Sequence, residues 1–416
     1  MKKLLAVFLA ISLILILKGS VEAQAIKADA NHDGKVDSAD YSLWLSNFNK
    51  SNLTAGDFNS DAKIDGIDYT IWLAEYGMVA PTSPPSPTAA PIGTYIRPFN
   101  PNSIWNKPIN ESNQSIAANS SQMIALLASE SDNQTTAPFV VSGTGESWSV
   151  PVYFADSNTP RKNVCGLQDN GSLIKCTFGL MPVDNNFYAS WDGGGAGADH
   201  KIAIIDTTNN HGWSAWSFKT ANLTYQGQHV DYTANYAAYG WTDLSQVGDG
   251  ITMHDGGAWG GRANGLSYFG GLIWPEEIAA GQINHALALS ISGSAVSKNT
   301  YWWPSRSGDG YSSNPNALPY GARLQLDPTF DITTLPTGPA RIVAKALQDY
   351  GAWLVDTGGS VGFYAREFMG SEGTSLDTTA WKNVGVSSSY FLRNLIPWSK
   401  FRILTQASSS NFYLNP

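Results

Sequence analysis

The chain lacks an excess of positive charge. Its 416 residues include 25 lysines and arginines against 34 aspartates and glutamates, which gives a net charge of -9. A surface that binds nucleic acid needs a basic patch to meet the phosphates, so we exclude a nucleic-acid partner. Much of the negative charge is local, because residues 24–78 contain nine acidic side chains and only four lysines.

The signatures of several enzyme classes are also missing. The sequence contains no phosphate-binding glycine loop, no HExxH zinc motif and no CxxC pair. Any reaction therefore has to be inferred from side chains in loops and not from a known catalytic motif.

No apolar run is long enough to span a bilayer comfortably. The stretch Leu4–Leu17 has 14 residues, whereas a membrane helix needs about 20. Two lysines precede it, and the small-residue stretch of Val21, Glu22 and Ala23 follows, which is the layout of a secretory signal peptide over residues 1–23. We expect a secreted or cell-surface protein with no transmembrane segment after cleavage; the alternative is an uncleaved membrane anchor.

Only two cysteines are present, Cys165 and Cys176. They flank the dipeptide Asn170-Gly171, which favours a type I′ hairpin turn. Two strands that fold back on this turn would bring the sulfurs together, and export permits a disulfide. Closing so short a loop contributes about 3 kcal/mol. The alternative is two unpaired thiols.

Two segments repeat at a spacing of 28 residues, DANHDGKVDSADYSLWL from Asp29 and DFNSDAKIDGIDYTIWL from Asp57. A calcium ion takes six to eight oxygen ligands, and a twelve-residue loop supplies them from positions 1, 3, 5, 7, 9 and 12. The repeats therefore predict two Ca²⁺ sites. The expected ligands are Asp29, Asn31, Asp33, the Lys35 carbonyl, Asp37 and Asp40 in the first loop, and Asp57, Asn59, Asp61, the Lys63 carbonyl, Asp65 and Asp68 in the second.

This pattern, over residues 24–78, resembles type I dockerin modules: twin D-x-N-x-D-x-x-[VI]-D-x-x-D loops, each running into a helix. The resemblance implies calcium-dependent folding and a cohesin-type protein partner. Two features depart from the family pattern. Position 6 is Ala62 in the second loop, and positions 10 and 11 lack the Ser/Thr pair that often contacts cohesin. Cohesin docking and a calcium-stiffened clasp on a surface protein therefore remain alternatives.

A linker separates this module from the rest of the chain. Residues 79–93 include five prolines and no charge, a composition typical of an extended spacer. Residues 94–416 then form a large, mainly β domain, a sandwich or barrel with a few covering helices. The expected strands are Phe139–Val141, Ser149–Phe154, Leu173–Phe178, Lys201–Asp206, Trp213–Phe218, His285–Ile291, Ala322–Leu326 and Ala352–Val355, and the expected helices are Ile116–Ser129, Trp274–Gly281, Gly338–Gly351 and Ser387–Leu395.

The large domain is rich in tryptophan, with thirteen between Trp105 and Trp398. Most are expected in the core, including Trp213, Trp216 and Trp353, which fall in apolar strand patterns. Those in loops rich in glycine, aspartate and serine are candidates for stacking on sugar rings. The candidate substrate-binding residues are Trp191, Trp241, Trp259, Arg262, Trp302 and Trp303.

Two glycine-rich loops supply the candidate catalytic residues, which are Asp199, His200, His254 and Asp255. Glycoside hydrolysis needs two carboxyl groups, which Asp199 and Asp255 could provide. A polysaccharide lyase needs a base and a cation for the uronate carboxylate, which suits His200, His254 and Arg262. By contrast, we expect structural roles for Glu276 and Glu277 at a helix start, for a buried His285, and for Arg323 as an ion-pair partner.

Export, the calcium loops, the linker and the loop aromatics together favour a secreted polysaccharide-degrading enzyme. The sequence leaves glycoside hydrolase and polysaccharide lyase both open. The alternative from another class is a non-catalytic carbohydrate-binding or cell-surface adhesion protein.

Overall fold

The structure is a computed structural model of the chain, and it describes residues 27–31, 35–50, 56–59, 61, 63–78, 95–194, 198–254 and 260–412. The chain divides into two compact units, Met1–Pro87 and Thr88–Pro416, which we treat separately. The predicted signal peptide, the linker over residues 79–93 and position 6 of the second loop, Ala62, lie outside the described residues. Within the described part, no helix is long and apolar enough to cross a membrane.

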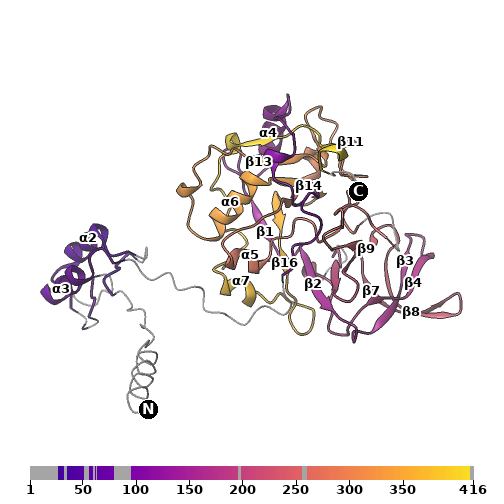
Figure 1. Cartoon of the computed structure of the whole chain (residues 1–416), viewed down its shortest axis with the longest axis horizontal. Coiled ribbons are helices and arrows are strands. Elements are labelled where there is room, and N and C mark those ends of the chain that lie inside the picture. Colours follow the sequence, from indigo (N-terminus) through magenta and orange to yellow (C-terminus); the bar gives the residue numbers. More distant parts are fainter. Residues whose placement is uncertain are drawn as a thin grey trace, which may run out of the picture. The chain divides into compact units, whose positions relative to one another are not determined.

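The smaller unit contains the two helices expected after the repeats, α2 (Ser38–Asn47) and α3 (Gly66–Glu75) (Figure 1). Each begins at an aspartate whose side chain accepts a hydrogen bond from the second residue along, Asp37 from Ala39 N and Asp65 from Ile67 N. Such N-caps satisfy amides that a helix leaves unpaired. The repeat in the sequence therefore encodes the same helix start twice.

The two repeats pair with each other across the smaller unit. Val36 N donates to Met78 O at 2.9 Å, and Ile64, 28 residues later, donates to Lys50 O at 3.2 Å. Val36 and Ile64, which occupy position 8 of each loop, are both buried. Two indoles also join the repeats: Trp44 Nε1 donates to Asp65 O in the second loop, and Trp72 Nε1 donates to Asp37 O in the first.

The larger unit is mainly β, with several sheets and few helices, as expected. Its six-stranded sheet has the order β1-β15-β10-β14-β13-β17, comprising β1 (Val140–Ser142), β15 (Gly362–Tyr364), β10 (Leu287–Ile291), β14 (Ala352–Thr357), β13 (Arg323–Leu326) and β17 (Phe401–Ile403). A five-stranded sheet has the order β16-β2-β5-β6-β9, comprising β16 (Arg366–Glu367), β2 (Val150–Ala155), β5 (Ile202–Asp206), β6 (His211–Ala215) and β9 (Tyr239–Asp243).

The remaining strands form smaller sheets. The four-stranded sheet has the order β4-β3-β8-β7, with β4 (Leu173–Pro182), β3 (Arg161–Leu167), β8 (Gln228–Asn235) and β7 (Lys219–Tyr225), and β11 (Val296–Tyr301) pairs with β12 (Leu318–Tyr320). The α-helices described are α4 (Ser120–Ser129), α5 (Pro275–Ala279), α6 (Pro339–Asp349), α7 (Thr379–Asn383) and α8 (Ser409–Phe412), and short 3₁₀ turns are η1 (Ile109–Glu111), η2 (Asp192–Gly194), η3 (Gly293–Ala295), η4 (Ile332–Thr334) and η5 (Trp398–Lys400).

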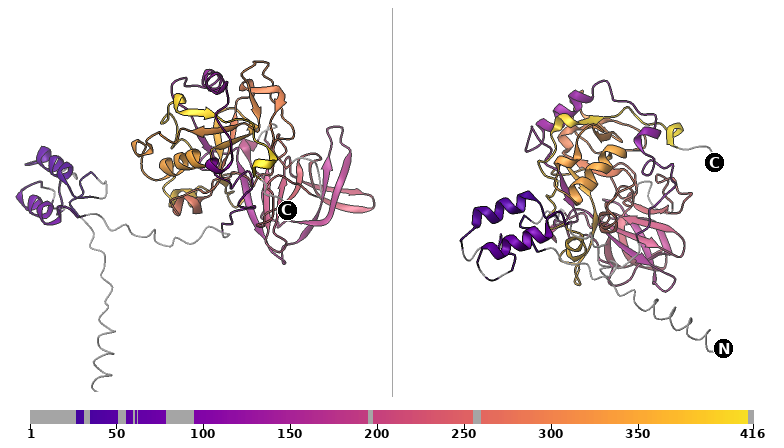
Figure 2. Two further views of the ribbon diagram at one scale, coloured as in Figure 1. Left: turned by 45° about the horizontal axis from the view of Figure 1, so that its top comes forward. Right: turned by 60° about the vertical axis from the view of Figure 1, so that its left-hand side comes forward.

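Alternating side chains pack the sheets in layers. In β5, Ile202 and Ile204 join the core against the four-stranded sheet, while Ala203 and Ile205 face the core shared with the six-stranded sheet. A strand buried on both faces reads as a continuous apolar run, which is why Lys201–Asp206 could be predicted. Helices α4 and α6 cover the far face of the six-stranded sheet. Figure 2 shows the orange and yellow elements at one end of this unit and the magenta strands at the other.

The eight predicted strands all coincide with strands of the structure, within a few residues. Three of the four predicted helices are confirmed as α4, α5 and α6. The helix expected over Ser387–Leu395 is wrong, because this segment is a series of turns. Its backbone bonds to other segments, Asn394 N to Ala137 O and Val141 N to Ser389 O, so those groups are not available to a helix.

The disulfide Cys165–Cys176 is present and joins β3 to β4. The turn between these strands differs from the prediction. Gly171 has a φ of +82°, but Asn170 is not among the residues with positive φ, whereas a type I′ turn needs positive φ at both central positions. Gln168 N instead donates to Ser172 O at 3.0 Å, which makes a wider loop with glycine as its one left-handed residue.

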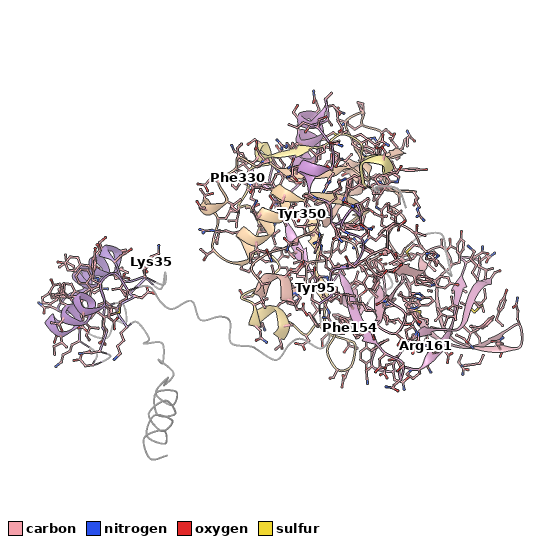
Figure 3. The ribbon with its side chains drawn as sticks, in the orientation of Figure 1. Lys35, Tyr95, Phe154, Arg161, Phe330 and Tyr350 are labelled. Carbon is pink, nitrogen blue, oxygen red and sulfur yellow. A yellow bond between two sulfur atoms is a disulfide. The ribbon has the colours of Figure 1, made fainter. Side chains whose placement is uncertain are left out.

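Glu277 of α5 and the buried His285 form the structural contact expected of them. Glu277 is buried and accepts hydrogen bonds from Tyr95 OH at 2.8 Å and from His285 Nε2 at 3.1 Å. Tyr95 is labelled in Figure 3. Arg323 is buried as well, but its hydrogen-bond partners in the described structure are carbonyl and amide oxygens, such as Tyr350 O at 2.8 Å, so the expectation that it forms an ion pair is wrong.

Candidate functional site

A cavity of about 790 Å³ lies where strand ends of two sheets meet. The six-stranded sheet contributes β1, β15 and the carboxyl ends of β10 and β14. The residues leading into β5 contribute Asp199 and Lys201, and Trp148 and Trp216 complete the wall. A pocket of this size, with aromatic walls and a few polar groups, is what a small-molecule or sugar site requires.

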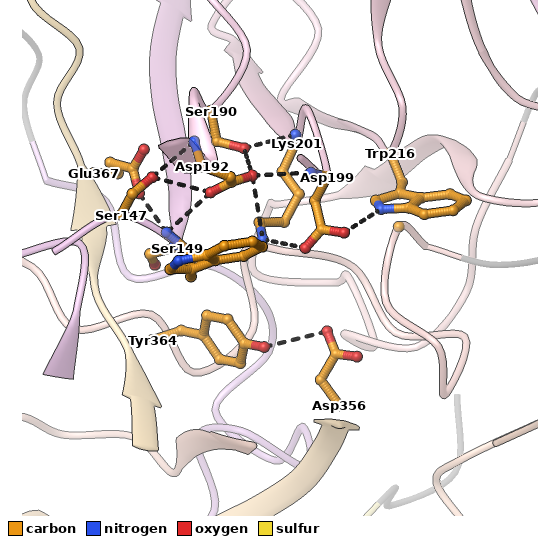
Figure 4. A network of polar contacts seen from close by, with 12 residues as sticks. Ser147, Ser149, Ser190, Asp192, Asp199, Lys201, Trp216, Asp356, Tyr364 and Glu367 are labelled. Atoms are coloured by element: carbon orange, nitrogen blue, oxygen red, sulfur yellow. Dashed lines mark hydrogen bonds and ion pairs between the residues drawn. The ribbon is translucent and has the colours of Figure 1, made fainter. Parts of the chain in front are cut away.

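Asp192 organises one side of the cavity although it is itself buried. Its two carboxylate oxygens accept hydrogen bonds from Ser147 Oγ at 3.0 Å, Trp148 N at 2.9 Å, Ser190 Oγ at 2.6 Å and Asp199 N at 3.1 Å. Figure 4 shows these bonds converging on one carboxylate. Asp192 therefore ties three separate segments together and fixes the residues that face the cavity.

Lys201 lies between Asp192 and Asp199. Its ammonium is 2.7 Å from Asp199 Oδ2 and 3.8 Å from Asp192 Oδ2, and its side chain is only 4% exposed. Burial lowers the pKa of Lys201, but the two carboxylates outweigh it and the pKa is raised. The lysine therefore carries its charge at neutral pH.

Asp199 is the partly exposed member of the network. Burial acts to raise the pKa of Asp199, but Lys201 and the hydrogen bonds from Lys201 and from Trp216 Nε1, at 3.1 Å, hold it below its ordinary value. Asp199 is thus an ionised carboxylate that faces the cavity.

Backbone strain gathers at the same place. Trp148, Asp192 and His200 all have positive φ, at +83°, +45° and +49°. A bulky residue such as tryptophan rarely adopts this conformation, and strained residues of this kind cluster at functional sites. The Trp148 amide hydrogen bond to Asp192 holds the strained turn in place.

A second carboxyl group, Asp356, faces the cavity from the end of β14. Burial raises the pKa of Asp356 to about 6, although Arg262 and Lys201 act against that shift. Tyr364 OH donates to Asp356 Oδ2 at 3.3 Å (Figure 4), and the Arg262 guanidinium lies 4.8 Å from the Tyr364 ring. Asp356 is therefore a carboxyl group that can hold a proton near neutral pH.

Glu367 lies behind the network and does not line the cavity. It is 1% exposed, and Glu367 Oε2 accepts a hydrogen bond from Ser149 N at 3.0 Å. Burial and the nearby charge of Asp192 raise the pKa of Glu367 to about 8. Glu367, which contacts the backbone next to the site, is therefore mostly neutral at pH 7.

Of the predicted catalytic residues that the structure describes, only Asp199 lines the cavity. His200 follows it in the chain but is not a lining residue. His254 stacks on Trp241 with ring centroids 4.3 Å apart and borders a separate, smaller depression. Asp255 lies outside the described residues. The two histidines and Asp199 therefore do not meet in one cleft.

The predicted sugar-binding residues are also dispersed. Arg262 lines the cavity, but it is 1% exposed and donates to backbone carbonyls of Ser267, Tyr268 and Gly270. Trp241 is sandwiched between His211 and His254.

Of the other four tryptophans, the three that the structure describes do not line the cavity. Trp302 and Trp303 pack against buried clusters, Trp191 covers its own turn at Gly194, and Trp259 lies outside the described residues. Trp213 and Trp353 are buried as predicted, whereas the expectation that Trp216 is a core residue is wrong, since it is 36% exposed and bonds Asp199.

Several site residues were missed from the sequence. Lys201 directly precedes the apolar strand β5, whereas Asp356 and Tyr364 lie at the ends of β14 and β15. A polar residue at such a position usually marks only a strand boundary. The usable signal was their position, because polar residues at the ends of buried strands collect at sheet edges.

The calcium ligands predicted in the second loop gather around one turn. Asp61 N donates to Asp57 Oδ1 at 3.1 Å and to Asn59 Oδ1 at 3.0 Å. Asp40 and Asp68, at position 12 of each loop, are buried and accept three backbone hydrogen bonds each.

The first loop is described only in part, because Asp33 lies outside the described residues. No group of three or more histidine, cysteine, aspartate and glutamate side chains that could hold a metal occurs among the residues described.

Comparisons of the chain with protein-family models, with curated proteins and with solved structures find no match.

Proposed function

We propose that the larger unit hydrolyses glycosidic bonds of a polysaccharide, with Asp356 as the general acid and Asp199 as its carboxylate partner. The observation that carries this proposal is that two carboxyl groups face one cavity with pKa values displaced in opposite directions. Glycoside hydrolysis requires one protonated and one ionised carboxyl group.

In the proposed reaction, Asp356 donates its proton to the glycosidic oxygen as the bond to the anomeric carbon breaks. Asp199 stabilises the positive charge that develops on the sugar, either by bonding to the anomeric carbon or by taking a proton from an attacking water. Lys201 keeps Asp199 ionised, and Asp192 keeps Lys201 in place. The carboxyl pair therefore has two defined roles.

The same observations favour hydrolysis over elimination. A lyase needs a base that is free to take a proton next to a uronate carboxylate. The pKa of Lys201 is raised, and burial together with Asp356 raises that of Tyr364 well above its ordinary value. Neither group is a ready base at neutral pH, and neither predicted histidine lines the cavity.

The second candidate function is carbohydrate binding without catalysis. Trp148 is 50% exposed at the cavity wall, and an exposed indole face can stack on a sugar ring in either case. Binding alone needs no carboxyl group with a raised pKa, so substitution of Asp356 separates the two functions.

For the smaller unit we propose a dockerin-like calcium module on a secreted or cell-surface protein. Asp57 Oδ1 and Asn59 Oδ1 both lie at the Asp61 amide in the second loop, and carboxylate and amide oxygens of this kind are the ligands that a hard cation takes. The paired backbone bonds of Val36 and Ile64 support a unit built from two equivalent loops. A cohesin-type partner and a calcium-stiffened clasp both follow from such a unit.

The test is to incubate the full chain with neutral, acidic and amino polysaccharides and to measure reducing ends and the absorbance of unsaturated uronates. The proposal predicts reducing ends without uronate absorbance, and their loss in Asp356→Asn. Binding that persists without any cleavage would favour the second candidate function. Absorbance from unsaturated uronates would establish a lyase.

A further inference from the structure

The cavity contains more negative than positive side chains. Four carboxyl groups line it, Glu146, Asp199, Asp309 and Asp356, against two cations, Lys201 and Arg262, among the residues that the structure describes. A cavity of one dominant sign concentrates ligands of the opposite sign and disfavours those of its own.

Both cations are already engaged by the protein. Lys201 lies between Asp199 and Asp192, and Arg262 is held by three backbone carbonyls beside the Tyr364 ring. Neither is placed as an exposed clamp for a uronate or sulfate group, because each side chain is less than 5% exposed.

Glu146 and Asp309 are the two lining carboxylates that have no role in the proposed reaction. Glu146 accepts a hydrogen bond from Tyr390, and Asp309 accepts from Tyr320 and from Thr357 Oγ1 at 3.2 Å. Hydroxyl groups satisfy hydrogen bonding but do not cancel charge. No ion pair to either residue occurs in the described structure.

The aromatic walls complement a cationic ligand. Trp148 and Trp216 are 50% and 36% exposed at the cavity. The face of an indole attracts an ammonium group, so carboxylates and indoles together form a site for an amine attached to an apolar ring.

From this arrangement we infer that the cavity takes a polysaccharide of amino sugars with free amino groups. Glu146 and Asp309 would recognise the ammonium, and polymers of N-acylated or acidic sugars would be poorer substrates. This inference rests on the proposed hydrolase function and adds its substrate class. Because both carboxylates are exposed, salt should screen the preference.

The experiment compares the hydrolysis by the full chain of three oligosaccharides of equal length: β-1,4-linked glucosamine, its N-acetylated form and a galacturonate. We expect kcat/KM about tenfold higher for the free amine than for the N-acetylated form at pH 6, with no cleavage of the galacturonate. In Glu146→Gln and Asp309→Asn, alone and together, the preference should fall to about twofold, because the amide side chains keep hydrogen-bond acceptors but lose the charge. Asp349→Asn, a surface change in α6, should keep it.

The outcomes separate the two proposals. Cleavage of a neutral or N-acetylated glycan as readily as the free amine would overturn the amino-sugar inference and leave the hydrolase standing. A preference that survives both substitutions would also overturn it. If no glycan in a wide panel is cleaved, the hydrolase proposal falls and the inference with it. Thermal melting shows whether each variant is folded. If the double variant does not fold, the two single variants still test the preference.

Discussion

The two units both gather carboxylates, but they hold them in different ways. In the smaller unit the Asp40 carboxylate accepts hydrogen bonds from backbone amides three to ten positions away in the chain, and Asp68 does the same in the second loop. In the larger unit Asp192 accepts hydrogen bonds from Ser147 and Trp148, which lie 45 and 44 positions earlier in the chain. Local spacing thus builds one cluster, and the sheet arrangement builds the other.

This difference explains why the two clusters suit different chemistry. Carboxylates within one loop are close together and accept hydrogen bonds from backbone amides, and under the calcium proposal they would offer oxygen atoms of similar character to a cation. Carboxyl groups brought together from separate strands meet different surroundings. Asp199 is held ionised by a lysine, while burial lets Asp356 keep its proton. The predictions below test that contrast.

The largest effect is expected for Asp356→Asn. The amide keeps the shape of the side chain and can still accept from Tyr364, but it cannot donate a proton to a leaving group. Loss of general acid catalysis typically lowers the rate by about 10² to 10⁴-fold. We expect this loss in kcat on the cleaved glycan, with thermal stability little changed. Unchanged kcat would show that Asp356 is not the acid.

Asp192→Asn should lower stability by about 3 kcal/mol. The substitution leaves Lys201 with one carboxylate and removes charge from a buried network of four hydrogen bonds. Denaturant unfolding measures the effect, with Asp132→Asn, an exposed residue, as the matched control. A loss as small as that of the control would mean that Asp192 does not organise the site.

Glu367→Gln should stabilise the protein at alkaline pH. Glu367 has a folded pKa of about 8 against an ordinary value of 4.5, so the unfolded state releases its proton first as pH rises. Stability is therefore lost progressively between about pH 4.5 and 8. The glutamine does not titrate and so removes this loss, and the stability difference between Glu367→Gln and the wild type should grow as pH rises from 4.5 to 8.

Melting temperatures from pH 4 to 9 measure that effect, and Glu372→Gln, an exposed change, is the control. Parallel curves for wild type and Glu367→Gln would contradict the raised pKa.

The smallest effects are expected in the smaller unit. Asp40→Asn and Asp68→Asn should each weaken calcium binding by about tenfold at one loop, because a position-12 carboxylate is a charged oxygen ligand in such loops. Calorimetric titration of the full chain with Ca²⁺ measures both sites. Failure of the wild-type chain to bind calcium would remove the dockerin-like proposal.

The sequence predicted what depends on local pattern. The 28-residue repeat predicted a helix in each half of the smaller unit, the apolar runs predicted β5 and β14, and the pattern over Gly338–Gly351 predicted α6. The cysteine spacing predicted the disulfide, although not the turn that joins its strands.

The cavity depends on long-range pairing and could not be predicted in the same way. Asp199 was a candidate, but its partners Lys201 and Trp216 were assigned to strands, and Asp356 was not considered. The order of strands in two sheets decides that these residues meet. The Ser387–Leu395 segment was mistaken for a helix for the same reason, since its backbone partners lie far away in the chain.

The most direct test of the account is the pH dependence of kcat/KM for a glycan that the full chain cleaves. With Asp356 as the acid, activity should fall as pH rises through about 6, where Asp356 loses its proton. It should also fall at acidic pH below the ordinary value of 3.8 for an aspartate, where Asp199 gains one. Activity that stays constant from pH 5 to 8 would contradict the assignment of Asp356 and the hydrolase mechanism with it.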